Sequence, residues 1–197
     1  ITTPYGFCLA LQSRFSATAS NPALLTVAEQ LSVVQELLSG FPIARWPDEI
    51  RGGILSVDFA AEIREISARA RQLGLDPHQL SDLGVAQGRE EWVAVGEFLE
   101  DYLDVLDFQN ALDYSELVHR TRLLLLEPGV EDVIRTEIKA VFCDEFSEFD
   151  TAQVKLLADL HRLGIPVIAF ADPSTRVFGF RGAEQSGVRN FEDWFPT

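Results

Sequence analysis

Two short apolar runs in the last third of the chain constrain its fold most strongly. The runs are Ala140–Cys143 and Val167–Ala171, and an acidic residue follows each of them. Between them, Asp150–Leu163 carries apolar residues at the spacing of an amphipathic helix. This pattern predicts a strand–helix–strand unit of a parallel sheet, because parallel strands need a crossover connection. We therefore expect an α/β fold with acidic groups at the carboxyl ends of two strands, where open α/β sheets bind ligands.

The middle of the chain has a helical pattern instead. Apolar residues recur at helical spacing after Ser56, a typical N-cap residue, and Gly74 is expected to end that helix. Trp46 is the expected anchor of the loop that precedes this helix. We expect residues 26–127 to be helical throughout, and the α/β pattern to begin only after about residue 136. Further helices are predicted over residues 6–15, 28–38, 90–108 and 114–126.

The charge of the chain limits its partners. Among 197 residues, 31 are acidic and 16 are basic, the formal net charge is −15, and only Lys139 and Lys155 are lysines. Proteins that bind nucleic acids usually carry a basic surface that displaces counterions from phosphates. We therefore expect weak or no binding of single-stranded or double-stranded DNA by the chain alone. A DNA-contacting piece of a larger protein remains compatible with this charge.

Much of the acidic charge lies on one face of the helix predicted over residues 90–108. A solvated surface and a binding site for a partner are both compatible with such a face, and solvation is the default interpretation. The carboxylates on this face are Glu97, Glu100, Asp101, Asp104 and Asp107.

The apolar runs and the cysteines indicate the compartment. No apolar run approaches the roughly 18–20 residues that span a bilayer. Cys8 and Cys143 are far apart in sequence, so neither a disulfide framework nor a zinc cluster is expected. These features predict a cytoplasmic protein with no membrane partner.

The first acidic strand end is the pair Asp144 and Glu145. A carboxylate in this place can bind Mg²⁺, because a hard cation prefers oxygen ligands. An adjacent glutamate can orient or deprotonate an attacking water molecule. Two acidic residues after a strand are also compatible with a solvated strand end or a helix cap, and the pair alone does not decide between these interpretations.

The second acidic strand end, Asp172, precedes a segment with two aromatic residues and an arginine. Phe178, Phe180 and Arg181 could present ring faces and a cation to unpaired bases. Stacking of this kind contributes roughly 1–3 kcal/mol per base and tolerates any sequence. Packing of both phenylalanines in the core is the alternative.

Taken together, these segments resemble a known family of motor proteins. The string D-E-F-x-x-x-D-x-A-Q begins at Asp144, and D-P-x-x-x-x-F-G-F-R-G-A begins 28 residues later, at Asp172. In this order and spacing they resemble motifs II and III of the UvrD/Rep-type superfamily 1 DNA helicases. L-D-Y-S-E-L at Leu112–Leu117 is similar to the segment in which that family returns from domain 1B to domain 1A. T-P-Y-G-F at Thr3–Phe7 is a weaker match to motif Ib.

The resemblance implies a domain organisation and a function. Residues 1–25 and 111–197 would form part of a RecA-like P-loop NTPase domain (domain 1A), and residues 26–110 would form an all-helical inserted domain (domain 1B). The parent protein would be an ATP-dependent DNA helicase or translocase moving on single-stranded DNA. The family includes RecB-like and AdnA/AdnB-type motors, and the strings G-R-E-E-W-V-A-V and L-D-Y-S-E-L-V-H-R look closest to the AdnA/AdnB type. This resemblance implies a DNA-repair helicase–nuclease and a partner helicase–nuclease subunit.

The resemblance also assigns roles to individual residues. Asp144 would bind the Mg²⁺ of Mg–ATP, and Glu145 would activate water for ATP hydrolysis. Phe178 and Phe180 would stack on single-stranded DNA, with Arg181 linking the nucleotide cleft to the DNA. The positions that would couple ATP to movement are Ser147, Asp172, Thr175 and Arg181. Two further residues, Thr3 and Tyr5, would lie near the DNA backbone.

The sequence departs from the family pattern at three of these positions. The family has glutamine in place of Ser147 and Thr175, and often histidine in place of Tyr5. A hydroxyl group on a shorter side chain does not reach a phosphate or water at about 2.9 Å without backbone movement or a bridging water. The carboxylates for metal and water are retained, whereas the amides that read the nucleotide state are replaced.

A larger difference is the absence of a phosphate-binding loop. The sequence contains no G-x-x-x-x-G-K-[ST] string and no Gly-Lys pair, and it begins within one motif and ends soon after another. We therefore expect a piece of a longer protein, with Mg²⁺ and ATP as cofactors of that protein and none bound to this chain. By itself the chain is expected neither to hydrolyse ATP nor to unwind DNA.

Two alternatives to an active motor remain open. The first is a non-catalytic, motor-like subunit that guides DNA or scaffolds an assembly, which the replaced glutamines motivate. The second is an unrelated acidic helical interaction module fused to a small α/β layer. The second alternative would be favoured if Asp144 and Asp172 lay at opposite ends of the sheet.

Overall fold

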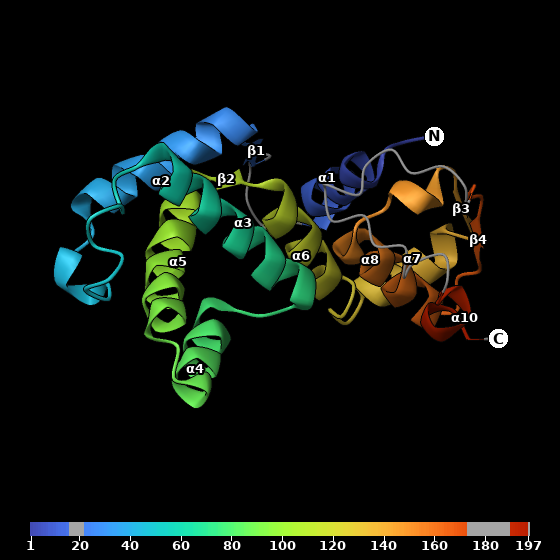
Figure 1. Cartoon of the computed structure of the whole chain (residues 1–197). Coiled ribbons are helices and arrows are strands. Elements are labelled where there is room, and N and C mark those ends of the chain that lie inside the picture. Colours follow the sequence, from blue (N-terminus) through green and yellow to red (C-terminus); the bar gives the residue numbers. More distant parts are fainter. Residues whose placement is uncertain (16–21, 173–189, 197) are drawn as a thin grey trace. The chain divides into compact units, whose positions relative to one another are not determined.

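The chain folds into two compact units (Figure 1). Unit 1 consists of Ile1–Ala19 and Leu117–Thr197, and unit 2 of Ser20–Glu116. The structure is a computed structural model that describes residues 1–15, 22–172 and 190–196. The chain therefore leaves unit 1, forms unit 2 as one continuous insertion, and returns. The boundaries lie after residues 19 and 116, compared with the expected 25 and 110.

A short pair of parallel strands lies where the chain enters and leaves unit 2. Strand β1 (Ala23–Leu24) pairs with β2 (Ala111–Leu112), and backbone bonds from Ala23 to Asn110 and from Leu25 to Leu112 extend the pairing, each at 2.9 Å. The prediction that residues 26–127 are helical throughout was therefore wrong at β2. A strand of two residues is too short to show alternation, and its pairing depends on a segment far away in sequence.

The rest of unit 2 consists mainly of helices, whose ends follow local rules. The Ser56 hydroxyl accepts a hydrogen bond from the Phe59 amide at 3.1 Å, as predicted for an N-cap. Gly74 ends the same helix in the left-handed conformation, with φ of 82°. The α-helices of unit 2, apart from the first turn of α6, are α2 (Val27–Gly40), α3 (Val57–Leu73), α4 (Pro77–Gln87) and α5 (Glu90–Phe108).

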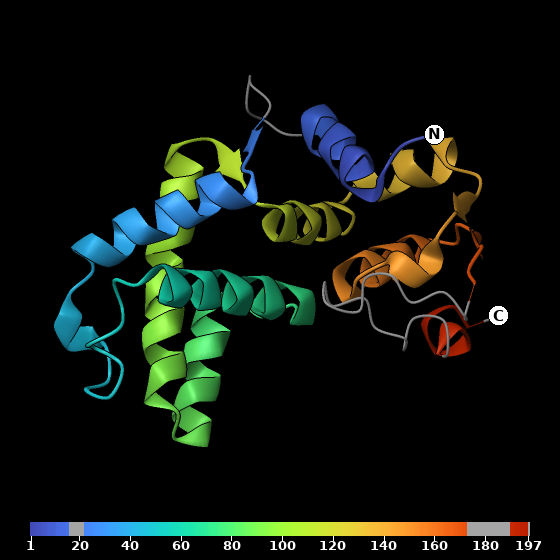
Figure 2. The same cartoon turned by 45° about the horizontal axis from the view of Figure 1, so that its top comes forward.

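Helix α5 is the centre of the helical packing in unit 2. Helix α4 runs along it, and α2 packs against both α3 and α5 (Figure 2). The α4–α5 contact requires glycine at Gly84 and Gly96, because a Cβ atom at Gly96 would lie 2.7 Å from the Pro77 carbonyl oxygen. The two helices therefore approach at backbone distance.

Aromatic side chains fill the core of unit 2 beside α5. Trp46 is 1% exposed, and its ring lies 5.2–5.9 Å from the rings of Phe41, Phe59 and Phe98. These distances and the tilted ring planes are those that aromatic pairs favour. The prediction that Trp46 anchors the loop before α3 is confirmed.

A buried polar network joins the helices of unit 2 to the segment after β2. The Asp113 carboxylate accepts hydrogen bonds from the Gln30 amide at 3.0 Å, the Tyr102 hydroxyl at 3.1 Å and the backbone amide of Glu116 at 2.8 Å. Arg71 pairs with the Glu116 carboxylate at 2.7 Å. Burial raises the pKa of Asp113, and the bonds from Glu116 and Tyr102 oppose that rise. The network caps helix α6 (Tyr114–Leu124) at its first turn.

Unit 1 has the α/β pattern. Strands β3 (Val141–Cys143) and β4 (Val167–Ala169) are parallel, and helix α8 (Thr151–Arg162) connects them. The predicted strand–helix–strand unit is therefore confirmed. The helix expected over residues 6–15 is α1 (Pro4–Phe15), and α10 (Phe191–Trp194) follows later in the chain.

Helix α7 (Val130–Glu137) of unit 1 was not predicted. The Pro128-Gly129 pair ends the preceding segment, as expected, but the chain enters a new helix immediately. Gly129 has φ of 90° and allows this change of direction, while Val130 and Ile134 bury the apolar side of the short helix. Eight residues give too few turns for a clear helical period.

We expect replacement of Asp113 to destabilise unit 2 by an amount that depends on how many of its hydrogen bonds the new side chain can keep. Asp113→Ala removes the α6 cap and leaves two buried donors without an acceptor, at a cost of about 2–4 kcal/mol in the free energy of unfolding. Asp113→Asn retains a cap oxygen, and the Gln30 amide and Tyr102 hydroxyl can turn to accept from the new amide. It should cost about 1 kcal/mol or less. Urea denaturation followed by tryptophan fluorescence measures both, and equal losses for the two variants would contradict the role of the network.

Candidate nucleotide site at the carboxyl end of the strands

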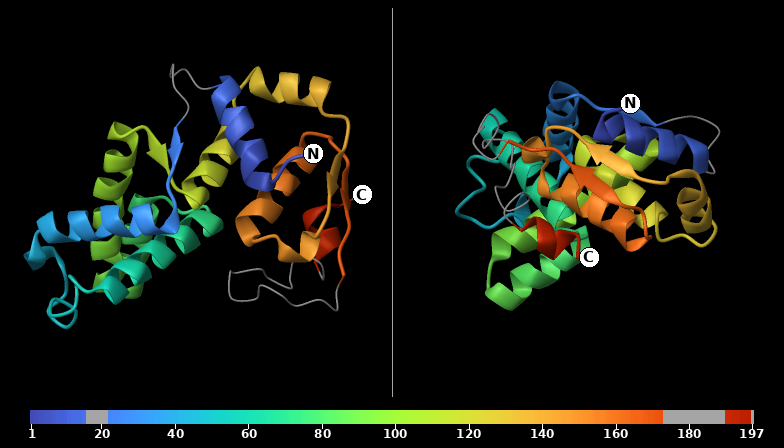
Figure 3. Two further views of the ribbon diagram at one scale, coloured as in Figure 1. Left: turned by 90° about the horizontal axis from the view of Figure 1, so that it is seen from above. Right: turned by 90° about the vertical axis from the view of Figure 1, so that its right-hand side faces the viewer.

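The pairing of β3 with β4 brings the two acidic strand ends to the same edge of the sheet. The two strands run side by side in the same direction (Figure 3). Val141 lies opposite Val167 and Cys143 opposite Ala169. Asp144 therefore follows the end of β3 at the edge where Asp172 follows β4. This is the arrangement expected of a nucleotide site in an open α/β sheet. An unrelated helical interaction module would instead have been favoured by acidic residues at opposite ends of the sheet.

The ladder between the strands contains one extra residue at the acidic pair. The Phe170 amide donates to the Cys143 carbonyl oxygen at 2.8 Å. In a regular parallel ladder the amide of Glu145 would then donate to the Phe170 carbonyl, but the amide of Phe146 does so instead, at 2.9 Å. Asp144 and Glu145 thus form a bulge, a feature that often changes the direction of side chains beside active sites.

Glu145 has an unusual backbone conformation in this bulge. Its φ of 52° and ψ of 39° lie in the left-handed region, where side chains other than glycine, asparagine and aspartate are rare. Its amide donates to the Asp144 carboxylate at 3.0 Å, which replaces the ladder bond. Both residues are exposed. The bulge therefore presents two adjacent carboxylates to solvent on a backbone that the ladder holds on either side.

A cavity of about 420 Å³ in unit 1 adjoins Asp144. Asp144 and Thr3 contribute polar groups to its lining, and Phe7, Val141 and Leu157 contribute apolar ones. Thr3, from the proposed motif Ib, and Asp144, at the first acidic strand end, therefore line the same cavity. The mostly apolar lining suits packing of chain or of a ring more than binding of a bare phosphate.

Both residues assigned to motif Ib have structural partners. The Thr3 hydroxyl accepts a hydrogen bond from the Gly6 amide at 3.0 Å and so caps α1. Tyr5 is a hydrogen-bond partner of Asp150, the N-cap residue of α8. Burial raises the pKa of Asp150, and its hydrogen bonds with two backbone amides and with Tyr5 oppose that rise. A side-chain contact therefore joins the first turn of α1 to the start of α8 within unit 1.

The structure describes only some of the residues that were predicted to couple ATP to movement. The Ser147 hydroxyl is buried, and it has no hydrogen-bond partner among the residues that the structure describes. Asp172 is exposed. The remaining predicted site residues lie outside the described ranges: Thr175, Phe178, Phe180 and Arg181.

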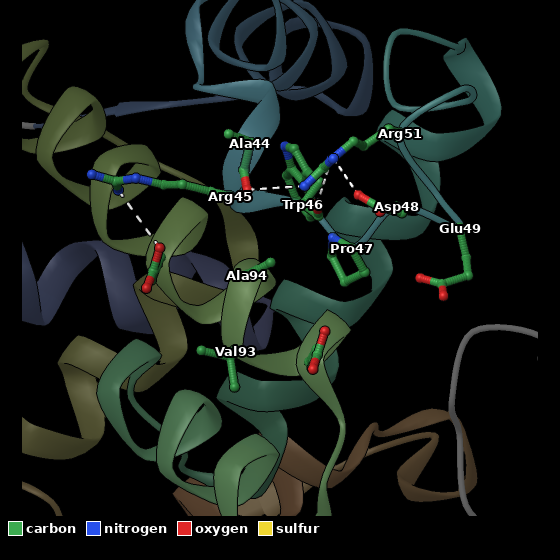
Figure 4. Close-up of a pocket in the computed structure, with 11 residues that line it drawn as sticks. Ala44, Arg45, Trp46, Pro47, Asp48, Glu49, Arg51, Val93 and Ala94 are labelled. Carbon is green, nitrogen blue, oxygen red and sulfur yellow. Dashed lines mark hydrogen bonds and ion pairs between the residues drawn. The ribbon is translucent and has the colours of Figure 1, made fainter.

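A second pocket, of about 390 Å³, lies in unit 2 and was not predicted (Figure 4). Arg51 donates to the Trp46 carbonyl oxygen at 2.7 Å and pairs with Asp48, and Arg45 reaches Glu97 at 3.7 Å. These bonds use both arginines to hold the loop before α3. The sequence signal that could have indicated it is the cluster of charged residues around Trp46.

Within residues 1–15, 22–172 and 190–196, no group of three or more His, Cys, Asp or Glu side chains could hold a metal ion. In the same part of the chain, no helix is both long enough and apolar enough to cross a membrane.

The sequence is similar to several curated helicases. It is 29% identical over 133 residues to the ATP-dependent DNA helicase UvrD1 of Mycobacterium tuberculosis, a match that covers 62% of this chain and 17% of that protein. DNA helicase II of Haemophilus influenzae is 25% identical over 119 residues, covering 60% of this chain and 16% of that protein. An ATP-dependent helicase/nuclease subunit of Lactococcus lactis is 23% identical over 125 residues, covering 62% and 10%.

These matches cover less than a fifth of each relative. A broader match extends over residues 7–196, nearly the whole chain, and is to the UvrD/REP helicase N-terminal domain. It agrees with the helix-rich α/β architecture and with the short parallel strands that carry the acidic pair. The chain belongs to the UvrD/REP helicase family.

Proposed function

We propose that this chain is part of an ATP-dependent DNA helicase or translocase that couples ATP hydrolysis to movement on single-stranded DNA. The observation that carries the proposal is the bulge at Asp144 and Glu145, in a chain of the UvrD/REP helicase family. It presents two adjacent carboxylates at the carboxyl edge of parallel strands, the edge that binds nucleotides in such sheets. The relatives named as ATP-dependent helicases support the same activity.

The carboxylates fit Mg–ATP as part of a site. Asp144 would hold Mg²⁺, with its second carboxylate oxygen free of the bond to the Glu145 amide. Glu145 would accept a proton from water. Bound Mg²⁺ supplies charge neutralisation on the phosphates. The phosphate-binding loop would come from outside this sequence, since the chain contains no Gly-Lys pair.

In this proposal the two units have different roles. Unit 1 is part of the RecA-like domain 1A, and unit 2 is the inserted domain 1B. The DNA-binding residues would be Phe178, Phe180 and Arg181, assisted by Thr3 and Tyr5. A role in a DNA-repair helicase–nuclease, of the RecB-like or AdnA/AdnB type and with a partner subunit, is the finer form of the proposal. The match to a helicase/nuclease protein supports it.

A non-catalytic, motor-like subunit is the second candidate. The observation that favours it is the Ser147 hydroxyl, which occupies the family's glutamine position and has no hydrogen-bond partner in the described part of the chain. An amide that reads the nucleotide is absent there. Such a subunit would guide DNA or scaffold an assembly without efficient ATP turnover.

The ATPase activity of the longer parent protein tests the first proposal. Glu145→Gln should lower kcat for ATP by about 10²- to 10⁴-fold while the protein still binds ATP, because it removes a general base but not the metal ligand. Asp144→Asn should weaken Mg²⁺-dependent ATP binding itself. The exposed Glu127→Gln changes the same charge outside the site and should leave kcat unchanged.

The 197-residue chain alone serves as a further control and should show no DNA-stimulated ATP turnover. Unaltered kcat in the Glu145→Gln parent protein would contradict the proposed role of the pair. Turnover by the chain alone would show that a complete site exists here after all.

A double replacement distinguishes the two candidates. In the parent protein, Ser147→Gln combined with Thr175→Gln should restore the family's amides and raise ATP turnover by at least about tenfold if weakened coupling limits the rate, since even one restored hydrogen bond to a charged group is worth about 1.5–3 kcal/mol. Steady-state ATPase assays with single-stranded DNA measure this. An unchanged rate would contradict the inference that Ser147 and Thr175 weaken the coupling of ATP hydrolysis to movement.

The strained backbone at Glu145 gives a prediction about stability. Glu145→Asn should change the free energy of unfolding by less than about 0.5 kcal/mol, because asparagine tolerates the left-handed region. Glu145→Val should lower it by about 1–2 kcal/mol, although valine favours strands, because a β-branched side chain is disfavoured at positive φ. Urea denaturation of the chain measures the pair, and equal effects of the two substitutions would show that the bulge does not persist in solution.

A further inference from the structure

A groove in unit 2 combines an apolar floor with an acidic rim. The groove has a volume of about 400 Å³ and lies between the C-terminal end of α2 and the second half of α5. Leu37, Phe41 and Val105 form its floor. An apolar floor of this size suits an aliphatic side chain more than a hydrated ion.

Three carboxylates form the rim, and together with the floor residues they define the acidic groove. They are Glu36 on α2 and Asp101 and Asp104 on α5, and all three are exposed. Among the residues that the structure describes, no ion pair involves any of them, whereas Glu97 and Glu100 on the same helix pair with Arg45 and His78. The rim therefore keeps its negative charge.

The chain itself shows how a cation can dock at the edge of this groove. The Arg45 guanidinium lies 3.7 Å from the Glu97 carboxylate and 5.3 Å from the centre of the Phe41 ring, which is also part of the floor. A guanidinium group is held well by a carboxylate together with a ring face. Glu97, Asp101 and Asp104 follow one another at helical spacing, so the acidic rim continues the stripe at which Arg45 docks.

We propose that the acidic groove binds a short basic segment of a partner protein, in which arginine residues flank an apolar side chain. The arginines would pair with Asp101 and Asp104, and the apolar side chain would enter the floor at Leu37 and Val105. Phe108, one turn after Asp104 and 92% exposed, would extend the apolar surface. DNA does not fit this groove, because its phosphates would meet three unpaired carboxylates. Opposite charge also accelerates association with a basic segment.

The proposal does not depend on ATP hydrolysis and can be tested on the 197-residue chain. The probe is a short fluorescein-labelled peptide in which arginine and leucine alternate, titrated with the chain at low salt and followed by fluorescence anisotropy. The test variant carries Asp101→Asn and Asp104→Asn. The control variant carries Glu62→Gln and Asp82→Asn, which change the same charge at exposed positions of α3 and α4 outside the groove.

We expect saturable binding that weakens about fivefold in the test variant and less than about twofold in the control, since each exposed ion pair contributes modestly. Replacing the leucines of the peptide with glycine should weaken binding as well, because the floor then has no occupant. Equal losses in the two variants would overturn the proposal by showing general charge attraction. It would also be overturned if the peptide did not bind, if a labelled single-stranded oligonucleotide bound the chain and the test variant lost that binding, or if the chain formed a dimer that only the test variant loses.

Discussion

Both units depend on a pair of parallel strands, and parallel pairing imposes a crossover. In unit 1, β3 and β4 can be adjacent and parallel only because α8 carries the chain back along the sheet. In unit 2, β1 and β2 are parallel as well, and the crossover between them is the whole set of helices from α2 to α5. The same rule thus places Asp144 and Asp172 at one edge in unit 1. It also lets the long insertion of unit 2 begin and end at adjacent points.

Features decided by neighbouring residues could be read from the sequence, and features decided by distant partners could not. The Ser56 cap and the Gly74 stop depend on side chains within one helical turn, and both are found as predicted. Strand β2 depends on residues almost ninety positions earlier, and its two residues carry no pattern of their own. Helix α7 was missed for another reason. The break at Pro128-Gly129 was predicted, but the helix that follows it is only eight residues long and shows no clear helical period.

The acidic pair shows the same division at the candidate site. Its place after a strand could be predicted, because the apolar run and the acidic residues are adjacent in sequence. The bulge could not, because glutamate at positive φ has no local signal and is imposed by the two bonds between Phe170 and the residues on either side. A conformation that local preferences disfavour persists only where the surrounding structure holds it, and such positions are concentrated at functional sites.

The carboxylates of this acidic chain have three different roles, and the burial and the partners of each carboxylate determine which role it has. Asp113 is 4% exposed and surrounded by donors, so its oxygen atoms serve as hydrogen-bond acceptors in the packing of unit 2. Asp144 is exposed and accepts one amide bond, which leaves an oxygen available to a cation. Asp101 and Asp104 are exposed above an apolar floor, and no described cation neutralises them. A net charge of −15 therefore does not describe a uniformly repulsive surface, because the consequence of each carboxylate depends on which donors or cations can reach it.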